Sequence, residues 1–368
     1  MNDVVVVGGG LAGSAFALEL ARSGARVTLL ERSRAPAMKV CGDFLSAEAL
    51  DLLAYLGIDA ARLGASRISR LTLAADKAVA DAALPFAASG LSRLALDEHL
   101  LAAAAHAGAE VVRGAHVTRI EARDGEAITH TDEARFVARG VALATGKHNL
   151  RGLPRDRGTA TGFKIQLSLS AAARRDLSGR VQLALFDGSY VGACLVEGDL
   201  ATLCWQVDTA HLKRVGADWR VQLEAFRVSP IFGDLLQDAR PVQPRPAAVS
   251  DLPFGYIRRA PVSESVYPIG DQLAVIPAFT GDGTSLALAS GIRAARAVLD
   301  GETGGVFQAM FTRDLWWQFR LAGVVGGLIR ARPTRRLAVS AARLLPSLAS
   351  HLARATRLSA IARPALIR

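Results

Sequence analysis

The chain has 368 residues, of which 51% are hydrophobic and 21% charged, a composition typical of a globular protein large enough for two lobes. No uncharged apolar run approaches the roughly 18 residues of a membrane span, and a predicted strand follows the first three residues, so we expect neither a span nor a signal peptide. The net charge of +10 resides in the C-terminal end, where 11 arginines and one acid follow from Arg313 onward, and the neutral body argues against nucleic-acid binding.

The first predicted elements form a strand–turn–helix unit. Residues 4–7 are four consecutive valines, which is typical of a strand buried on both faces. Gly8, Gly10 and Gly13 follow as G-x-G-x-x-G, and a helix is predicted from about Ser14 to Ser23. In this pattern the glycines allow a tight turn, close approach of a pyrophosphate and close packing of helix on strand.

A second strand, ARVTLL, ends at Glu31. A carboxylate at this place accepts hydrogen bonds from an adenosine ribose and repels a 2′-phosphate, so FAD or NAD is favoured over NADP. Strand, loop, helix, strand and acid occur in order over residues 4–31, and the alternative, an ordinary turn that binds no nucleotide, is correspondingly weak.

Between about Arg151 and Arg259 the apolar pattern changes from helical to alternating. The segments FKIQLSLS, RVQLALF, YVGACLVEG and LATLCWQVD predict antiparallel strands, residues 210–236 one or two helices, and residues 240–253 a proline-rich return linker. Such a sheet, inserted into a nucleotide-binding fold, suits the roof of a substrate cavity.

A second glycine loop follows at residues 270–283. The segment predicts a strand ending at Ile269, then Asp271, then Pro277, Gly281 and Gly283 before a helix that begins near Thr284. NAD needs no such loop, whereas FAD is longer, so we expect this loop to bind the flavin end, with Asp271 accepting hydrogen bonds from ribityl hydroxyls. FAD is therefore the predicted cofactor.

These segments, together with LSRLALDEHLLAAAAHAGAEVVRG and FVARGVALATG, resemble the para-hydroxybenzoate-hydroxylase-like FAD superfamily over about residues 3–300. The motifs KVCGDFLS and TGDG resemble its geranylgeranyl-reductase branch and related oxidoreductases of polyketide pathways. The resemblance implies an α/β fold: a doubly wound, Rossmann-like FAD-binding lobe of residues 1–150 and 260–305. An antiparallel-sheet substrate lobe of residues 151–259 and a basic helical extension of residues 306–368 complete it.

The resemblance also implies cofactor contacts. Arg93 would contact the phosphate region, the backbone of Val117 would pair with the adenine, and residues 144–146 would lie near the adenosine half. The predicted cofactor-binding residues are Gly8, Gly10, Ala12, Gly13, Glu31, Arg32, Arg93, Val117, Gly146, Asp271, Pro277, Gly281, Gly283 and Thr284. The Trp-x-Trp-x-Ile-Pro signature of flavin halogenases is absent from the sequence, which argues against halogenation.

In this superfamily the flavin performs the difficult step, so no catalytic triad is expected. The resemblance places Cys41 beside the flavin, either as a participant or, more in keeping with most thiols, as a packing residue. Asp43 could orient substrate or relay a proton, or it could cap the helix predicted near Ser46. The three cysteines and the histidines lack metal-ligand spacing, so no metal site is expected, and a reducing cytoplasmic setting fits the cysteines.

Four further residues have two interpretations each. Lys147 and His148 follow the ATG strand and either contact substrate anions or belong to a solvated loop. Tyr190 and Trp205 lie on the predicted inserted sheet and either line the cavity or pack in the core.

The tail shows apolar residues at helical spacing, at Ala341, Leu344, Leu348, Leu352, Ala355 and Leu358, with Arg336, Arg343, Arg354 and Arg357 on the flank. A helical hairpin packed over the substrate lobe with solvated arginines is one interpretation. A basic surface for anionic lipid, at the inner face of the membrane, or for an acidic acyl carrier protein is the other.

The sequence therefore predicts an FAD oxidoreductase acting on a small apolar substrate. The leading hypothesis is a flavin monooxygenase, reduced by transiently bound NAD(P)H, that hydroxylates an aromatic or polyketide-like molecule. The alternative is a reductase that saturates isoprenoid or polyene double bonds, and a third is a flavin-loaded interaction protein without turnover.

Overall fold

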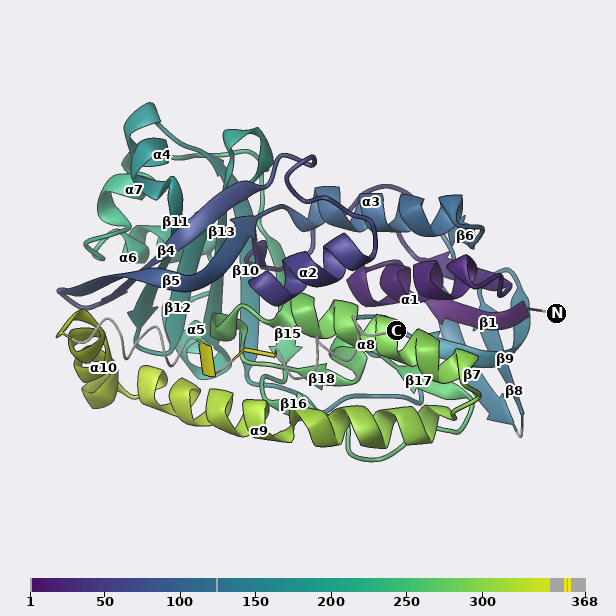
Figure 1. Ribbon diagram of the computed structural model, residues 1–368. Helices are drawn as coiled ribbons and strands as arrows, with labels where there is room; N and C mark the ends of the chain where they lie inside the picture. Colours follow the sequence, from purple (N-terminus) through teal and green to yellow (C-terminus); the bar gives the residue numbers. More distant parts are fainter. Residues whose placement is uncertain (1, 124, 345–353, 356, 359–368) are drawn as a thin grey trace.

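In the computed structural model, which describes residues 2–123, 125–344, 354–355 and 357–358, the chain forms two lobes, each built on one large sheet (Figure 1). A long helix, α9 (Gly304–Arg330), runs beneath both lobes. This is the mixed α/β architecture that the sequence predicted.

The first lobe contains a seven-stranded sheet with the order β6-β2-β1-β9-β8-β7, and β17 also pairs with β9. Its strands are β1 (Asn2–Val7), β2 (Val27–Glu31), β6 (Glu110–Arg113), β7 (Val117–Arg123), β8 (Glu126–Thr131), β9 (Arg135–Leu143) and β17 (Val266–Pro268). Strands β6, β2, β1, β9 and β17 are parallel, so their carboxyl ends meet at one edge of the sheet. The four valines of β1 are at most 3% exposed, as expected for a strand covered on both faces.

Helices α1 (Leu11–Arg22) and α3 (Arg93–His106) pack on this sheet, and α8 (Gly283–Leu299) packs on α1. The predicted start of α1 at Ser14 was late, because the turn after β1 is short and Gly10 already occupies the N-cap. Gly13 lies inside the helix and is needed there, since a Cβ at Gly13 would lie 1.9 Å from the carbonyl oxygen of Gly8.

The second lobe contains a nine-stranded sheet, β14-β10-β13-β12-β11-β4-β5-β3, with β15 also paired to β10. Its strands are β3 (Phe44–Leu45), β4 (Ser66–Ala75), β5 (Ala78–Gly90), β10 (Ala160–Ser168), β11 (Gly179–Phe186), β12 (Ser189–Leu195), β13 (Ala201–Asp208), β14 (Arg240–Pro241) and β15 (Ala247–Leu252). The four predicted strands, β10 to β13, are confirmed. Two expectations were wrong. Strands β3 to β5 join this sheet, although residues 1–150 were assigned to the first lobe. The segment 240–253, predicted to be a linker, contains β14 and β15.

The remaining short elements cover or connect the two sheets. They are α2 (Ala47–Tyr55), α4 (Ala171–Leu177), α5 (Thr209–Val215), α6 (Trp219–Phe226), α7 (Gly233–Gln237), β16 (Tyr256–Ile257) and β18 (Ala274–Val275). Residues 210–236 thus contribute to three helices, not one or two. The core of the second lobe centres on Trp205, which stacks on Phe163 at 5.2 Å and meets Phe226 edge-on at 6.1 Å.

Helix α9 and α10 (Arg332–Leu344) form the C-terminal extension. Helix α10 packs over the second lobe as expected, with Val339 buried in a cluster that includes Leu185. Helix α9 instead buries Phe307, Phe311 and Leu315 in the core of the first lobe. Pro346 and the predicted apolar positions Leu348 and Leu352 lie outside the described residues, and none of the described helices is long and apolar enough to span a membrane.

Candidate cofactor and substrate site

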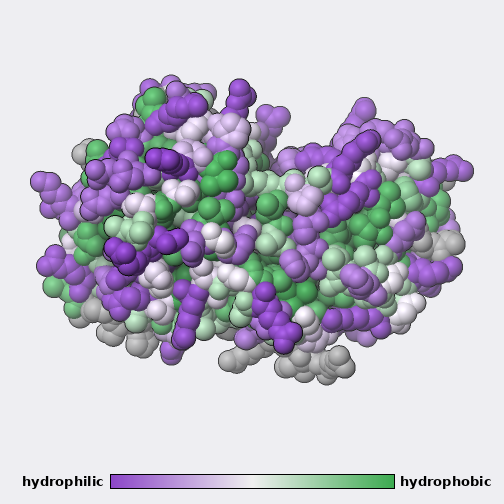
Figure 2. Space-filling view, turned by 90° about the horizontal axis from the view of Figure 1, so that it is seen from above, coloured by the Kyte–Doolittle hydropathy of each residue, from purple (hydrophilic) through white to green (hydrophobic). Residues whose placement is uncertain are grey.

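A continuous hollow lies where the carboxyl ends of the parallel strands of the first lobe face the second lobe. Its first half is lined by residues from the ends of β1, β2 and β9, and its second half by the start of α8 and by strands β12 and β13. Gly10, Arg93, Gly146 and Asp271 line both halves. On the face seen in Figure 2, hydrophilic side chains cover both lobes and apolar side chains lie between them. The hollow occupies the edge of the sheet at which ligands of open α/β folds bind.

The glycine turn between β1 and α1 leaves open space at the hollow. Gly8 has φ of +111°, and a Cβ there would lie 2.4 Å from the carbonyl oxygen of Ala144. At Gly10 a Cβ would meet only the Arg93 guanidinium, at 3.6 Å. The first amides of α1 therefore face the hollow beside a cation, which is the arrangement that binds a pyrophosphate.

Glu31 is buried at the end of β2 and lines the first half of the hollow. Its carboxylate accepts hydrogen bonds from the amides of Gly9, at 2.8 Å, and Ser33, at 2.7 Å. Burial alone would raise the pKa of Glu31, but these amides outweigh it and hold the pKa below its usual range. An ionised carboxylate is thus fixed where a ribose is expected, with Arg32 beside it and in contact with His148 at 3.2 Å.

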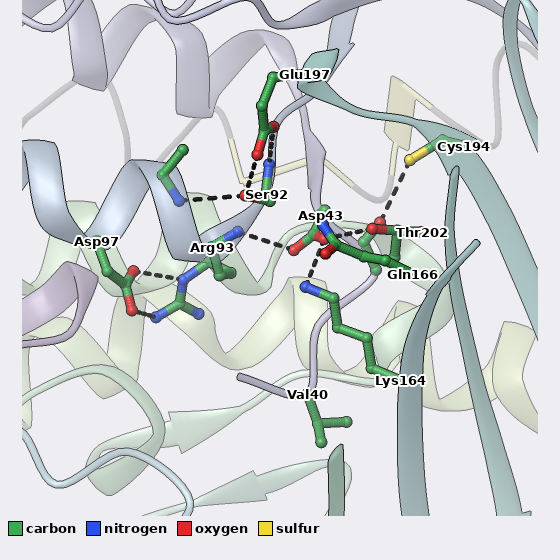
Figure 3. A network of polar contacts seen from close by, with 12 residues as sticks. Val40, Asp43, Ser92, Arg93, Asp97, Lys164, Gln166, Cys194, Glu197 and Thr202 are labelled. Carbon is green, nitrogen blue, oxygen red and sulfur yellow. Dashed lines mark hydrogen bonds and ion pairs between the residues drawn. The ribbon is translucent and has the colours of Figure 1, made fainter. Parts of the chain in front are cut away.

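Arg93 begins α3 and is held by Asp97 through two hydrogen bonds of 2.6 and 2.9 Å (Figure 3). Burial would lower the pKa of Arg93, but the carboxylate of Asp97 raises it above its already high usual value. The guanidinium therefore remains charged at the boundary between the two halves of the hollow, as a phosphate contact requires. Val117 and Gly146 line the first half, where the adenosine was expected.

The second glycine loop borders the other half of the hollow. Gly281 has φ of +71°, and a Cβ there would lie 2.8 Å from the ring of Phe44. Gly283 has open space around it and, with Thr284 and Ala12, lines the hollow. Asp271 lines both halves, whereas Pro277 lines a neighbouring pocket toward α9. The two glycine loops thus border opposite halves of one hollow that fits a long dinucleotide.

Asp43 lies at the centre of a buried polar network (Figure 3). Its Oδ2 lies 2.5 Å from Nζ of Lys164 and accepts a 2.6 Å hydrogen bond from Thr202, while Oδ1 accepts from the backbone amide of Arg93 at 3.1 Å. Burial raises the pKa of Asp43, and Lys164 together with the two hydrogen-bond donors opposes that rise.

The structure settles one of the two interpretations of Asp43. The N-cap of α2 is Ser46, whose hydroxyl accepts from the amide of Ala49, so the prediction that Asp43 caps this helix was wrong. The carboxylate of Asp43 faces Lys164 and Thr202 of the second lobe. Asp43 therefore ties residues 40–44, a wall of the hollow, to strands β10 and β13.

The substrate end of the hollow is lined by Cys41, Tyr190, Cys204, Gln206 and Phe254. Burial raises the pKa of Cys204 to about 12 and also raises the pKa of Tyr190, so both groups stay protonated at neutral pH. Cys41 is a free thiol in this wall. Trp205 packs in the core of the second lobe and also lines the hollow, so both of its interpretations apply.

Three cations near the hollow were not recognised as structural from the sequence. Lys147 donates to the carbonyl oxygen of Val40, and Arg155 donates to the carbonyl oxygens of Lys147, at 2.7 Å, and Asp271, at 3.1 Å. Lys164 pairs with Asp43. The available signal for Lys164 was its place inside FKIQLSLS, where a lysine lies within a run of buried residues. Among the described residues, no group of three or more His, Cys, Asp or Glu could hold a metal ion.

Known proteins resemble this chain in sequence and in fold. Residues 1–140 match a family model described as FAD binding domain. Protein FixC of Escherichia coli strain K12 is 28% identical, with 81% of this chain and 76% of that protein covered. Menaquinone reductase of Mycobacterium tuberculosis strain H37Rv is likewise 28% identical, with the same coverage.

Solved structures share the fold. The flavin-dependent brominase Bmp2 gives a TM-score of 0.82 at 16% identity, over 98% of this chain and 94% of that chain. The halogenase PltM in complex with phloroglucinol and FAD gives 0.74 at 15% identity, over 99% and 85%. Identities this low establish the fold and not the reaction.

Proposed function

We propose that this FAD-dependent oxidoreductase reduces an unsaturated bond in an extended apolar substrate, with NAD(P)H as the transient electron donor. The residues around the hollow fit FAD. The first amides of α1, Glu31 and Arg93 would hold the adenosine diphosphate, and the loop at residues 281–284 would hold the flavin end. FAD, when bound there, supplies the hydride chemistry.

The shape of the apolar space carries this proposal. The pocket between α9 and the second lobe shares Tyr190, Gln206, Phe254 and Ala278 with the substrate end of the hollow, so the two spaces adjoin. The outer pocket is lined largely by apolar groups, namely Leu185, Phe186, Phe279 and Ile329. A compact ring would fill only part of this passage, whereas a chain-like apolar molecule could extend along it. A relative named for the reduction of menaquinone supports the same class of reaction.

The protein's own part in such a reaction is to exclude water, to orient the extended apolar substrate and to hold protons. Reduction adds a hydride to one carbon of the double bond and a proton to the other, while NAD(P)H is oxidised to NAD(P)⁺. The hydroxyl of Tyr190 and the thiol of Cys204, whose pKa values are raised by burial, are protonated groups in the wall beside the expected flavin end. Cys41 lines the same wall, and Asp43 would act on it by holding residues 40–44 in position.

Hydroxylation of an apolar aromatic molecule is a second candidate. One observation favours it: the family model matched by residues 1–140 belongs to the hydroxylase-like enzymes of the superfamily. Such a reaction would also benefit from a wall that excludes water.

Anaerobic and aerobic turnover separate the two reactions. The purified holoprotein is supplied with NADH or NADPH and a polyunsaturated isoprenoid quinone, and products are identified by mass. Reduction of the substrate without oxygen supports the reductase. Oxygen uptake matched to NAD(P)H oxidation and to a hydroxylated product refutes it and supports the monooxygenase. A bound flavin that no nicotinamide reduces refutes both and leaves the interaction protein without turnover.

A further inference from the structure

Helix α9 is apolar on both of its faces. Its inner face buries Phe307, Phe311 and Leu315 in the first lobe. Its outer face exposes further large apolar side chains, which include Trp316 at 53%, Trp317 at 63%, Val324 at 63% and Leu328 at 48%. A helix on a globular protein normally presents polar residues to water, and exposed apolar groups gathered on one element indicate an interaction surface.

The charged residues on this outer face are arginines. Arg313, Arg320 and Arg330 are exposed, and the Arg320 guanidinium lies 4.8 Å from the centre of the Trp316 ring. Asp314 is the one acidic residue of the described helices α9 and α10, and it pairs with Arg293 at 2.9 Å and with Arg313 at 3.6 Å, so that two arginines surround its single negative charge. The exposed charge on this face is therefore positive.

The exposed end of α10 adds Arg336, Leu337, Arg343 and Leu344 to the same kind of surface. Two other arginines of the tail do not contribute. Arg335 is only 3% exposed in its side chain, near Asp76, and Arg357 is buried against Asp282 at 2.8 Å. The surface is thus the set of exposed apolar and arginine residues of α9 and α10, and we call it the outer face.

The outer face adjoins the mouth of the apolar passage. Gly323, Gly326, Ile329 and Arg330 of α9 line the pocket that leads to Tyr190. Gly323 is exposed and lies seven residues after Trp316, so both lie on one stripe of the helix. An apolar molecule that enters beside Gly323 therefore meets the tryptophans outside and the passage inside.

We propose that the outer face docks on the surface of an anionic lipid bilayer and that substrate enters the passage from the lipid. Tryptophan at the headgroup level and arginine on lipid phosphates are the side chains that interfacial helices use. An acidic carrier protein would match the arginines but would leave the row of exposed tryptophan, valine and leucine without a lipid-like partner. A second copy of the chain would bring like charges together. The entry of substrate rests on the proposed function, whereas docking does not.

Vesicle flotation of the full chain tests docking without turnover. The probes are vesicles of phosphatidylcholine alone and of phosphatidylcholine with about 30% phosphatidylglycerol, at low and moderate salt. We expect flotation with the anionic vesicles and at least about a tenfold loss in Trp316→Ser/Trp317→Ser. Arg313→Gln/Arg320→Gln should lose the preference for anionic lipid. Val228→Ser is the matched control, because Val228 is 78% exposed on the second lobe, away from α9.

Tryptophan fluorescence gives a second readout of the same surface. Docking should shift the emission of the wild type to shorter wavelength, because Trp316 and Trp317 leave water. Trp205 is already buried, and the half-buried Trp219 lies on α6 of the second lobe, outside the outer face. The double tryptophan variant should show no such shift. Absence of flotation at low salt, or equal flotation of all variants, overturns docking, as does capture by an acidic carrier protein without vesicle binding. Vesicle binding with no reduction of any isoprenoid quinone would leave docking intact and refute the proposed function.

Discussion

The buried ion pair between Asp43 and Lys164 gives the most direct test of how the two lobes are held together. Both side chains are at most 1% exposed, and their charged atoms lie 2.5 Å apart. Replacing Lys164 with methionine leaves a carboxylate in a site that cannot solvate it. Removal of one partner of a buried pair costs about 3–5 kcal/mol, against a total stability of about 5–15 kcal/mol for typical domains.

The pH dependence of this loss follows from the pKa of Asp43. Burial already raises the pKa of Asp43 in the folded protein, and Lys164 opposes the rise. In Lys164→Met the folded pKa rises further above the unfolded value, so the carboxyl takes up a proton to remain folded. Stability is then retained at low pH and lost as the pH rises, by up to about 1.4 kcal/mol per pH unit below the folded pKa.

The assay is urea unfolding followed by far-ultraviolet circular dichroism at pH 6 and pH 8. Lys164→Met should be less stable at pH 8 than at pH 6 by about 1–3 kcal/mol relative to the wild type. Asp43→Asn/Lys164→Met has no charge to titrate and should recover much of the loss without this pH dependence. If Lys164→Met is as stable as the wild type at both pH values, or if the two substitutions are additive, the reasoning is wrong.

Three further predictions concern the cofactor and the second glycine loop. Arg93→Met should weaken FAD binding by about 10–100-fold in titration calorimetry, and Arg32→Met, which removes an exposed side chain, should weaken it much less. Gly13→Ala should yield a colourless or unfolded protein because its Cβ meets backbone at 1.9 Å, whereas Gly283→Ala should keep the wild-type circular dichroism, any effect being on the flavin spectrum. Burial raises the pKa of Asp282 to about 7, so its contribution to stability falls as the pH rises from about 4 to 7. Asp282→Asn should flatten that fall in urea unfolding, and an unchanged slope would contradict the assignment.

The nucleotide-binding elements could be predicted because their determinants are local. The requirement for glycine at position 13 arises between residues that are close in the sequence, because its Cβ would meet the carbonyl oxygen of Gly8, and Glu31 follows its strand directly. The second glycine loop could be predicted for the same reason. These segments carry turn and helix-start signals in their own sequence. The distant residues that approach Gly8 and Gly281, namely Ala144 and Phe44, could not be read from it.

The parts that escaped prediction depend on contacts between distant residues. Strand β5 is rich in alanine, which has low strand propensity, and it forms because it pairs with β4, which in turn pairs with β11 in the second sheet. In the tail, the sequence does not distinguish a buried arginine from an exposed one, because each carries the same charge. Only the fold reveals that the side chains of Arg335 and Arg357 are buried near Asp76 and Asp282, while those of Arg313 and Arg320 are exposed.

The contacts of residues 40–44 explain why position 43 is occupied by a charged residue and not by an apolar one. A well-packed apolar pair in place of Asp43 and Lys164 could be equally stable or more stable, so stability alone does not explain the ion pair. Asp43, however, adopts φ of +55° and bonds the amide of Arg93 as well as Lys164 and Thr202. One carboxylate thus fixes the start of α3, which carries the phosphate-binding cation, to the sheet that carries the substrate wall. An apolar side chain has no directional bonds with which to set that distance, and we infer that the charge is kept for the relative position of cofactor and substrate.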